Sequence, residues 1–481
     1  MNHQQVEILA IGAGPSNLAF AIAIEEMAPA DLAQRTIIIE QHDGVVWQRG
    51  MLLPWTQSQV SFLKDLVTMR NPLSRFSFVN FLHSEGRLHD FVNMASFLPF
   101  RVEISAYLAW VARSLEHVRV QYGQKCVGVE AVKSPGGIIT GWMVTMADGS
   151  TIGAKTLVVG AGREARVPEV FRELPAERVI HSTDYSARIT GIDPEAAMRV
   201  VVIGAAESAA EMLWETHQRL PKSQCAMVMR TVGLDYYQTS KFTNELYFPS
   251  FTDKFFDAPA EARKQVLQAM RQTNYAGVTP EMLDTLFRQI YLERLIGQQR
   301  LSMITMVDVT SAAVRDDEVV LTLHDRMMGT DREHRCDLVM LGTGFEPRMP
   351  AIVRGAANAC GVEQIQVSRA YRLVTPPSVL ADCYLQGTNE ETHGIADSLI
   401  SVLAVRAGEI VEDILASRAE QAGLGSADAN GSGHGDGGAL ADEASVVPPS
   451  VIPTSASTPL TETAFPDAEV AAPTSAYTGT V

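Results

Sequence analysis

The chain has 481 residues, of which 46% are hydrophobic, and a formal net charge of −17 at pH 7. This length is sufficient for two or three domains with buried cores. The acidic balance argues against a nucleic-acid partner, because phosphate binding needs basic stripes and the sequence has none. No apolar run reaches the roughly 20 residues that span a bilayer, and the first residues lack the pattern of a secretion signal. We therefore expect a cytoplasmic protein with no membrane or nucleic-acid partner.

The cysteines and histidines give no sign of a metal site. No two cysteines form a CxxC pair, so the sequence encodes neither a zinc ribbon nor a redox disulfide. His393 has no second ligand at metal spacing. We expect no bound metal.

The first residues predict a dinucleotide-binding turn. An apolar run at 6–11 leads into the sequence Gly-Ala-Gly-Pro-Ser-Asn and then into an apolar helical segment. Gly12 permits the sharp turn, Gly14 lets the backbone approach a pyrophosphate, and a helix that begins at Pro15 directs its N-terminus at the phosphate. Asn17 replaces the third glycine of the strict pattern.

A second strand supplies the acidic residue that such a turn requires. The apolar run 36–39 ends at Glu40, which can accept a hydrogen bond from a ribose hydroxyl. The order of strand, turn, helix, strand and acid favours a dinucleotide site over a plain βαβ unit.

A second fingerprint follows later in the chain. The apolar run 199–203 leads into Gly204, and Ser208 lies in the predicted phosphate turn. Ala206 stands where a middle glycine is usual, so a structural turn without a nucleotide is the alternative interpretation.

Two further apolar strands end at glycine pairs and flank the second fingerprint. Residues 155–159 precede Gly160, and residues 336–340 precede Gly342 and Gly344. This recurrence favours a nested α/β fold, in which a second Rossmann-like domain is inserted in the first and a small, mainly helical region binds the substrate. The predicted divisions are a first domain of 1–165 and 336–420, an inserted domain of 166–335 with the helical region near 240–295, and a disordered acidic tail of 421–481.

Candidate residues for substrate binding and catalysis lie in the segment between the first fingerprint and residue 72. It carries Trp47, Gln59 and Lys64 among apolar residues and has no clean amphipathic period. Lys64 is either an ordinary surface lysine or a cation that holds an anionic group of the substrate.

Several strings of the chain resemble one enzyme family. They are GAGPSNLAFA, WQRGMLLP, QVSFLKDLVTMRNPLSRFSFVNFL, FTNELY, TNYAG and THGIADSLISVLAVRAGEI. Together they are similar to the N-hydroxylating flavoprotein monooxygenases of siderophore biosynthesis, most closely the L-ornithine N(5)-monooxygenases, over roughly residues 5–415.

The resemblance implies a reaction and its cofactors. FAD would bind in the first domain and NADPH in the inserted one, and a flavin hydroperoxide formed with dioxygen would hydroxylate the side-chain amine of L-ornithine to give N(5)-hydroxyornithine. One alternative is an L-lysine N(6)-hydroxylase, because lysine is one methylene longer than ornithine and one methylene changes binding by only about 1–3 kcal/mol. The other alternative is an uncoupled flavin NADPH oxidase. The resemblance also implies a homo-oligomer, a dimer or a tetramer.

The resemblance further assigns roles to residues of this chain. Lys64 would hold the substrate carboxylate, and Arg230 would hold the 2′-phosphate of NADPH. The implied catalytic residues are Gln59, Lys64, Asn244, Asn274 and Ser401. The implied substrate-binding residues are Lys64, Asn244, Asn274, Leu399 and Ser401. The implied cofactor-binding residues are Gly12, Gly14, Pro15, Asn17, Glu40, Trp47, Gln59, Gly204, Ser208, Arg230, Asn274, Gly344, His393 and Leu399.

This chain also departs from the family pattern. Gln48 replaces the usual histidine after the tryptophan, and Ala206 and Glu207 replace the glycine and glutamine of the usual GGGQSAAE. Tyr236 and Tyr237 stand where small or acidic residues are common. We expect these changes to affect the handling of the nicotinamide nucleotide and not the flavin chemistry.

Overall fold

The computed structural model describes residues 3–238, 240–275, 277–346 and 348–430. Up to residue 424 the described residues form one compact unit. The expected tail, 421–481, begins within a helix, because α15 (Leu403–Asn430) continues to residue 430. Gln421 and the alanines at positions 422, 427 and 429 favour this continuation. The rest of the expected tail, 431–481, lies outside the described residues.

The first sheet is a mixed sheet of seven strands that contains the first fingerprint. Its order is β3-β2-β1-β6-β5-β4, and β15 pairs with β6. The strands β1, β2, β3, β6 and β15 run parallel, whereas β5 pairs antiparallel with both β4 and β6. The bounds are β1 His3–Ile11, β2 Thr36–Ile39, β3 Arg119–Gln121, β4 Cys126–Lys133, β5 Ile139–Met146, β6 Thr151–Val159 and β15 Cys383–Leu385.

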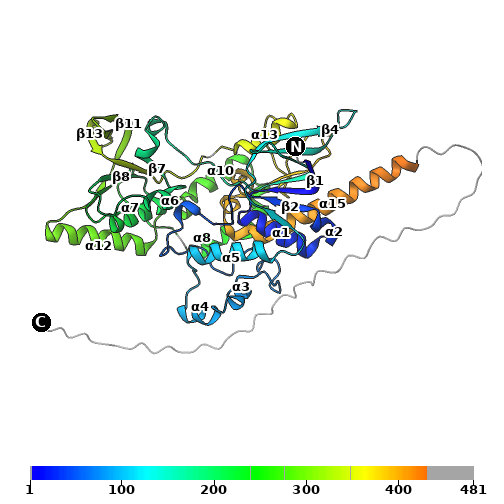
Figure 1. Ribbon diagram of the computed structural model, residues 1–481, viewed down its shortest axis with the longest axis horizontal. Coiled ribbons are helices and arrows are strands. Elements are labelled where there is room, and N and C mark those ends of the chain that lie inside the picture. The colour runs from blue at the N-terminus through cyan, green and yellow to red at the C-terminus, as the bar shows by residue number, and fades with distance from the viewer. Residues whose placement is uncertain (1–2, 239, 276, 347, 431–481) are drawn as a thin grey trace, which may run out of the picture. The chain divides into compact units, whose positions relative to one another are not determined.

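Alternate residues of the central strand β1 enter two different cores. Ile8 and Ala10 pack with the helices on one face, and Leu9 and Ile11 pack with residues of β5 and α13 on the other. A parallel strand that is covered on both faces is apolar at every position, which explains the unbroken run that the sequence shows. Figure 1 shows α1, α2 and α15 beside this sheet. The helices are α1 Pro15–Met27, α2 Ala30–Gln34, α3 Phe78–Ser84, α4 Leu88–Met94, α5 Arg101–Ser114 and α13 Ala351–Ala359.

The second sheet is parallel throughout and contains the second fingerprint. Its order is β10-β9-β8-β14-β7, and helices α6, α7 and α12 belong to the same part of the chain (Figure 1). The two sheets with their helices are the two Rossmann-like units that the sequence predicts. The bounds are β7 Val179–His181, α6 Tyr185–Ile189, β8 Arg199–Ile203, α7 Glu207–Arg219, β9 Gln224–Val228, α12 Pro280–Ile296, β10 Leu301–Ile304 and β14 Leu338–Leu341.

The position of β14 corrects the predicted domain boundary at residue 336. Leu338 pairs with Val200 of β8, and Val339 pairs with Val179 of β7, so this strand lies between two strands of the second sheet. An apolar strand followed by glycines is typical of either sheet, and only its pairing partners distinguish them. The inserted unit therefore extends to Leu341.

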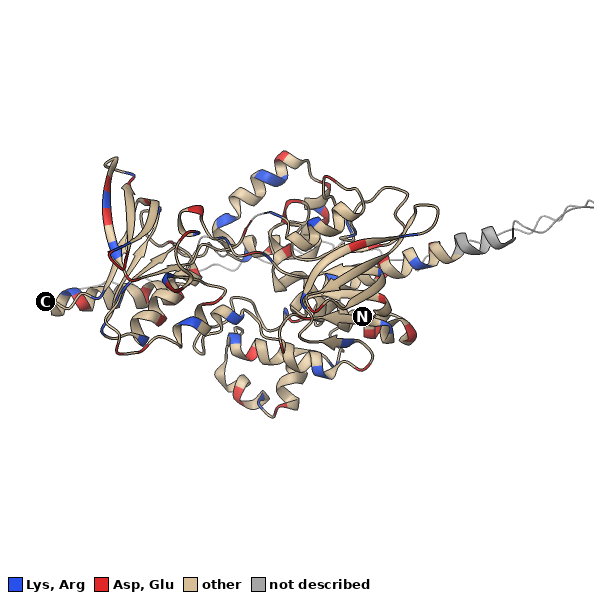
Figure 2. Cartoon of the chain, turned by 45° about the horizontal axis from the view of Figure 1, so that its top comes forward, with Lys and Arg blue, Asp and Glu red and all other residues tan. Residues whose placement is uncertain are grey.

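A three-stranded antiparallel sheet precedes β14. Its strands β11 (Val307–Arg315), β12 (Glu318–Asp325) and β13 (Thr330–Cys336) carry charges of both signs, which Figure 2 shows side by side. Arg315 pairs with Glu333, and Arg335 pairs with Glu318. The arginines on these strands therefore lie beside carboxylates.

The helical region near 240–295 divides into two parts. Tyr247 and Met270 pack against Ile395, Ala396 and Val402, which follow the last strand of the first sheet. By contrast, α12 shares the core of the second sheet, so it is not part of a separate substrate-binding lobe. The short helices of the first part are α8 Lys241–Asn244, α9 Pro249–Asp257, α10 Ala260–Ala269 and α11 Arg271–Asn274. No helix in the described part of the chain combines the length and the apolar character that crossing a bilayer requires.

Candidate functional site

One cleft of about 3730 Å³ connects the two fingerprints. Its lining includes Gly12 and Gly14 from the first turn and Gly204 and Ser208 from the second. Ligands of open α/β sheets bind at the carboxyl ends of the strands, and both turns occupy that position here. A single cleft is therefore accessible to two dinucleotides.

The first turn has the geometry of a pyrophosphate site. Gly12 has φ +92°, and a Cβ there would lie 2.8 Å from the carbonyl oxygen of Gly160. A Cβ on Gly14 would meet no atom within 4 Å, so this glycine faces open space in the cleft. Helix α1 begins at Pro15 without a side-chain cap, which leaves its N-terminal amides for an anion.

Glu40 is held at the edge of this turn. Its Oε2 accepts a hydrogen bond from the amide of Ala13 at 2.8 Å, and its Oε1 accepts one from the amide of His42 at 3.0 Å. Each carboxylate oxygen can accept a second bond, so Glu40 is able to receive a ribose hydroxyl.

Asn17 is buried and does not line the cleft, and its predicted role as a cofactor ligand stays a prediction. Its amide nitrogen donates to the carbonyls of Ile11 and Gly12 at 2.9 and 2.8 Å, and its Oδ1 accepts a bond from Gln386 at 2.8 Å. The residue in place of the third glycine thus ties the turn to the segment after β15.

The second turn tolerates its departures from the family pattern. Ala206 has φ −122° and ψ 179°, an extended conformation that does not require glycine. The carboxylate of Glu207 accepts bonds from the amide and the hydroxyl of Thr279 at 2.7 and 3.0 Å. Burial raises the pKa of Glu207, and the bonds from Thr279 oppose that shift. The carboxylate of Glu207 therefore lies at the start of α12.

Arg230 is exposed, lines the cleft and follows the neighbouring strand β9.

Lys64 lies half-buried on the cleft wall. Its Nζ is 5.7 Å from the ring centroid of Phe248, and burial lowers the pKa of the ammonium group. The neighbouring Asp65 does not neutralise it, because that carboxylate accepts bonds from the amides of Val67 and Thr68 at 3.0 and 2.6 Å and from that of Phe78 at 2.7 Å. Within the described residues burial is the one influence on the Lys64 ammonium and no carboxylate pairs with it, so its charge is available to an anionic ligand.

The other predicted substrate residues come from three separate segments and share this cleft. Asn244 ends α8 and Asn274 ends α11, whereas Leu399 and Ser401 follow the last strand of the first sheet. The remaining predicted residues on the lining are Trp47, Gln59 and Gly344.

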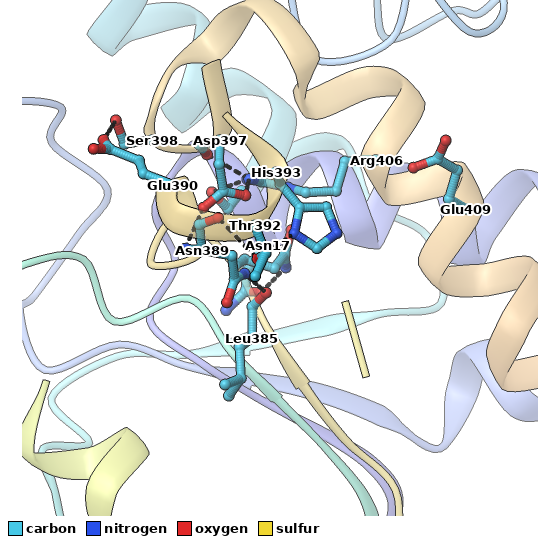
Figure 3. Close-up of polar contacts among 12 residues, drawn as sticks. Asn17, Leu385, Asn389, Glu390, Thr392, His393, Asp397, Ser398, Arg406 and Glu409 are labelled. Atoms are coloured by element: carbon cyan, nitrogen blue, oxygen red, sulfur yellow. Dashed lines mark hydrogen bonds and ion pairs between the residues drawn. The ribbon is translucent and has the colours of Figure 1, made fainter. Parts of the chain in front are cut away.

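His393 is a second predicted cofactor residue that is buried, and its contact with the cofactor stays a prediction. It is 2% exposed and absent from the cleft lining. Its ring stacks on Tyr371 with centroids 4.1 Å apart, and its Nε2 lies 3.1 Å from the carbonyl oxygen of Arg369. Burial lowers its pKa to about 4. His393 is therefore a neutral packing residue behind the cleft (Figure 3).

A polar cluster beside Asn274 and Leu399 was not predicted. Arg163 Nη2 lies 2.7 Å from Glu390 Oε1, and Ser398 Oγ donates to the same oxygen at 2.6 Å. Tyr275 also donates to Glu390, and burial raises the pKa of this tyrosine to about 12. The cluster joins the two fingerprint-bearing parts of the chain at the cleft. In the sequence, only the glycine pair before Arg163 indicated that this cluster lies near a nucleotide.

Three buried side-chain oxygens on the segment 386–389 have no partner among the described residues. They are Oε1 of Gln386, Oγ1 of Thr388 and Oδ1 of Asn389, and all three residues line the cleft. Leaving such atoms unpaired costs free energy that a bound ligand can recover. They fit a group with several hydrogen-bonding positions, such as a flavin. The described residues contain no cluster of three or more histidine, cysteine or acidic side chains that could hold a metal.

Comparison with known proteins identifies the family of this chain. The family model of L-lysine 6-monooxygenase/L-ornithine 5-monooxygenase matches residues 4–347. The L-ornithine N(5)-oxygenase of Arthrobotrys oligospora is 37% identical over 428 residues, which are 85% of this chain and 88% of the relative.

Two solved structures extend the likeness to the fold. The ornithine N-hydroxylase of Kutzneria sp. 744, with reduced FAD, NADP+ and L-ornithine, has a TM-score of 0.81 and 32% identity over 86% of this chain and all of that chain (100%). The L-lysine 6-monooxygenase of Pseudomonas syringae has a TM-score of 0.75 and 28% identity over 86% of this chain and 99% of that chain. The chain therefore belongs to the L-lysine 6-monooxygenase/L-ornithine 5-monooxygenase family.

Proposed function

We propose that this chain is an FAD- and NADPH-dependent monooxygenase that hydroxylates the side-chain amine of L-ornithine. The observation that carries the proposal is the shared cleft, which joins two dinucleotide turns to an unpaired cation and two amides. Lys64 is the cation, and Asn244 and Asn274 supply the amides. A flavin oxidase without an amino acid substrate would not need this carboxylate clamp.

The clamp determines where the substrate amine lies. Lys64 donates to the α-carboxylate, and the amides of Asn244 and Asn274 have the donors and acceptors to complete recognition of an α-amino acid. The side chain then extends along Leu399 toward Ser401. Bound FAD, reduced by NADPH, supplies the activated oxygen.

The amine must lose a proton before it can react. An alkyl ammonium has an ordinary pKa of about 10.4 and no lone pair, so only its neutral form is a nucleophile. The hydroxyl of Ser401 and the backbone carbonyl of Leu399 can accept hydrogen bonds from the neutral amine and hold it in position. Apolar residues such as Leu399 and Phe248 limit the access of water.

Ornithine is favoured over lysine by the higher identity to the structure of an ornithine enzyme, 32% against 28% to that of a lysine enzyme. The two substrates differ by one methylene, which is worth about 1–3 kcal/mol in a fitted pocket. Comparing kcat/KM for both amino acids at the same pH decides between them.

The test of the function is direct. Purified protein is expected to be yellow, and ornithine is expected to accelerate NADPH oxidation and to yield one hydroxylamine per NADPH. Oxidation that gives only hydrogen peroxide with either amino acid would identify an uncoupled oxidase, and a colourless protein that binds no added FAD would reject the proposal.

We also propose that the enzyme self-associates, is cytoplasmic and supplies hydroxyornithine to siderophore biosynthesis. Phe287, Tyr291 and Leu295 are 67%, 60% and 70% exposed at successive turns of α12, an apolar face that suits a second copy. All five cysteines are free thiols, as a reducing compartment requires. Light scattering of the purified protein tests the association, with a monomer as the contrary result.

A further inference from the structure

The segment after β15 contributes to both ends of the proposed site. Gln386 and Asn389, near the start of this segment, line the cleft. Leu399 and Ser401, near the end of the segment, also line it. Between them lie α14 (Glu390–His393) and the turn Ile395–Ser398. The position of this segment therefore affects flavin and amine together.

Arg406 is the buried centre that holds the segment. It lies on α15, and neither its side chain nor that of Asp397 is exposed, at 0% each. Its Nη1 donates to Asp397 Oδ1 at 2.8 Å and to the carbonyl oxygen of the same residue at 2.5 Å. Asp397 Oδ2 accepts a bond from the amide of Asn389 at 2.7 Å. Figure 3 shows Arg406, Asp397 and Asn389 converging.

The same guanidinium reaches the first dinucleotide turn. Its Nη2 donates to Oγ of Ser16 at 2.8 Å, and Ser16 lies on the cleft wall in the first turn of α1. Because Arg406 can only donate, the serine oxygen must accept this bond. The hydroxyl hydrogen of Ser16 then remains available to donate to a phosphate oxygen in the cleft.

A parallel link runs through the neighbouring residues. Gln386 donates to Asn17, which in turn holds the carbonyls of Ile11 and Gly12. Two adjacent residues of the phosphate turn, Ser16 and Asn17, are thus bonded to one segment that also carries the amine pocket.

From these contacts we infer that Arg406 is a positioning residue that fixes the phosphate turn and the amine pocket in one geometry. It orients Ser16 toward the dinucleotide and, through the carbonyl and carboxylate of Asp397, sets the turn that precedes Leu399. The second half of this inference rests on the proposed function, whereas the first half concerns FAD binding alone.

The experiment uses full-length protein and two readouts. Apoprotein is titrated with FAD to obtain the dissociation constant from flavin fluorescence, and the hydroxylamine formed per NADPH oxidised is measured at saturating FAD and ornithine. Arg406→Lys keeps the charge but cannot reach both partners, so it is expected to weaken FAD binding at least tenfold and to halve the yield or lower it further. Arg418→Lys is the matched control, because Arg418 lies on the same helix and pairs with Glu7 at 2.7 Å away from the cleft.

Ser16→Ala keeps the test decisive if Arg406→Lys does not fold. It removes the Oγ that accepts the bond from Arg406 and that can donate to the dinucleotide phosphate, so it is expected to weaken FAD binding about tenfold. Wild-type FAD affinity in Ser16→Ala, or an unchanged yield in folded Arg406→Lys, would overturn the inference. If wild-type protein forms no hydroxylamine, the proposed function fails, and the FAD titration still tests the contact between Arg406 and Ser16.

Discussion

Arg101 and Glu211 form a bidentate ion pair between α5 beside the first sheet and α7 beside the second. Nη1 lies 2.8 Å from Oε2 and Nη2 lies 2.6 Å from Oε1, with both side chains almost fully buried. Burial raises the pKa of Glu211 to about 7, and the guanidinium of Arg101 opposes that shift. This pair links the two nucleotide-binding units.

Replacing one partner of the pair is expected to destabilise the protein. Glu211→Gln leaves Arg101 buried with a neutral partner, and breaking a buried pair costs about 3–5 kcal/mol. Urea unfolding measures the change. Glu195→Gln is the control, because Glu195 pairs with Lys222 on the exposed surface, where the expected change is below about 1 kcal/mol. Equal losses in the two variants would contradict the prediction.

Loss of the Lys64 ammonium is expected to weaken substrate binding without affecting the flavin. A hydrogen bond to a charged group contributes about 1.5–3 kcal/mol, so Lys64→Met is expected to raise the KM for ornithine by about 10- to 100-fold. Steady-state kinetics and the FAD content per chain are the measurements. Lys222→Met, an exposed lysine, serves as the control. An unchanged KM would show that Lys64 does not hold the carboxylate.

Arg230 is expected to distinguish NADPH from NADH. A guanidinium can form two parallel bonds to the 2′-phosphate, so Arg230→Ala is expected to raise the KM for NADPH by about 10- to 100-fold and to leave NADH unaffected. Arg332→Ala, at an exposed position of β13, is the control. A parallel loss with both nucleotides would point to a structural role.

His393 is expected to make stability depend on pH. Its pKa falls from an ordinary 6.5 to about 4 on burial, so between these values the unfolded chain binds more protons than the folded one. The free energy of unfolding therefore decreases as the pH falls from 6.5 to 4, by up to about 3 kcal/mol from this group. Urea unfolding of His393→Gln across this range is expected to show a weaker decrease, while His89→Gln, at an exposed position, follows the wild type. If the free energy of unfolding of His393→Gln decreases as steeply as that of the wild type, other groups cause the pH dependence.

The regular elements and both phosphate turns were predictable because their signals are local. An apolar run, a glycine with positive φ and a helix start lie within a few residues of one another at Gly12 and again at Gly204. The nested order of the two units is seen in β15, which pairs with β6 of the first sheet after the second sheet is complete, whereas the apolar run 336–340 that suggested it belongs to the second sheet.

Long-range partners account for what the sequence did not reveal. The apolar run at β14 could pair in either sheet, and Gln386, the partner of Asn17, is distant in sequence. In the same way, Arg406 lies in an apolar helical string, where nothing nearby indicates that Asp397 and Ser16 share its guanidinium. Arg406 and Ser16 are 390 positions apart, and Gln386 and Asn17 are 369 positions apart.

The order in which the strands occur also affects how the protein folds during synthesis. The inserted sheet has all its strands once Leu341 has emerged, whereas the outer sheet still lacks β15, which ends at Leu385. Domains tend to fold as units as the chain leaves the ribosome, and pairings distant in sequence form slowly. The second sheet is therefore positioned to form first, and the first sheet is complete only when β15 has emerged.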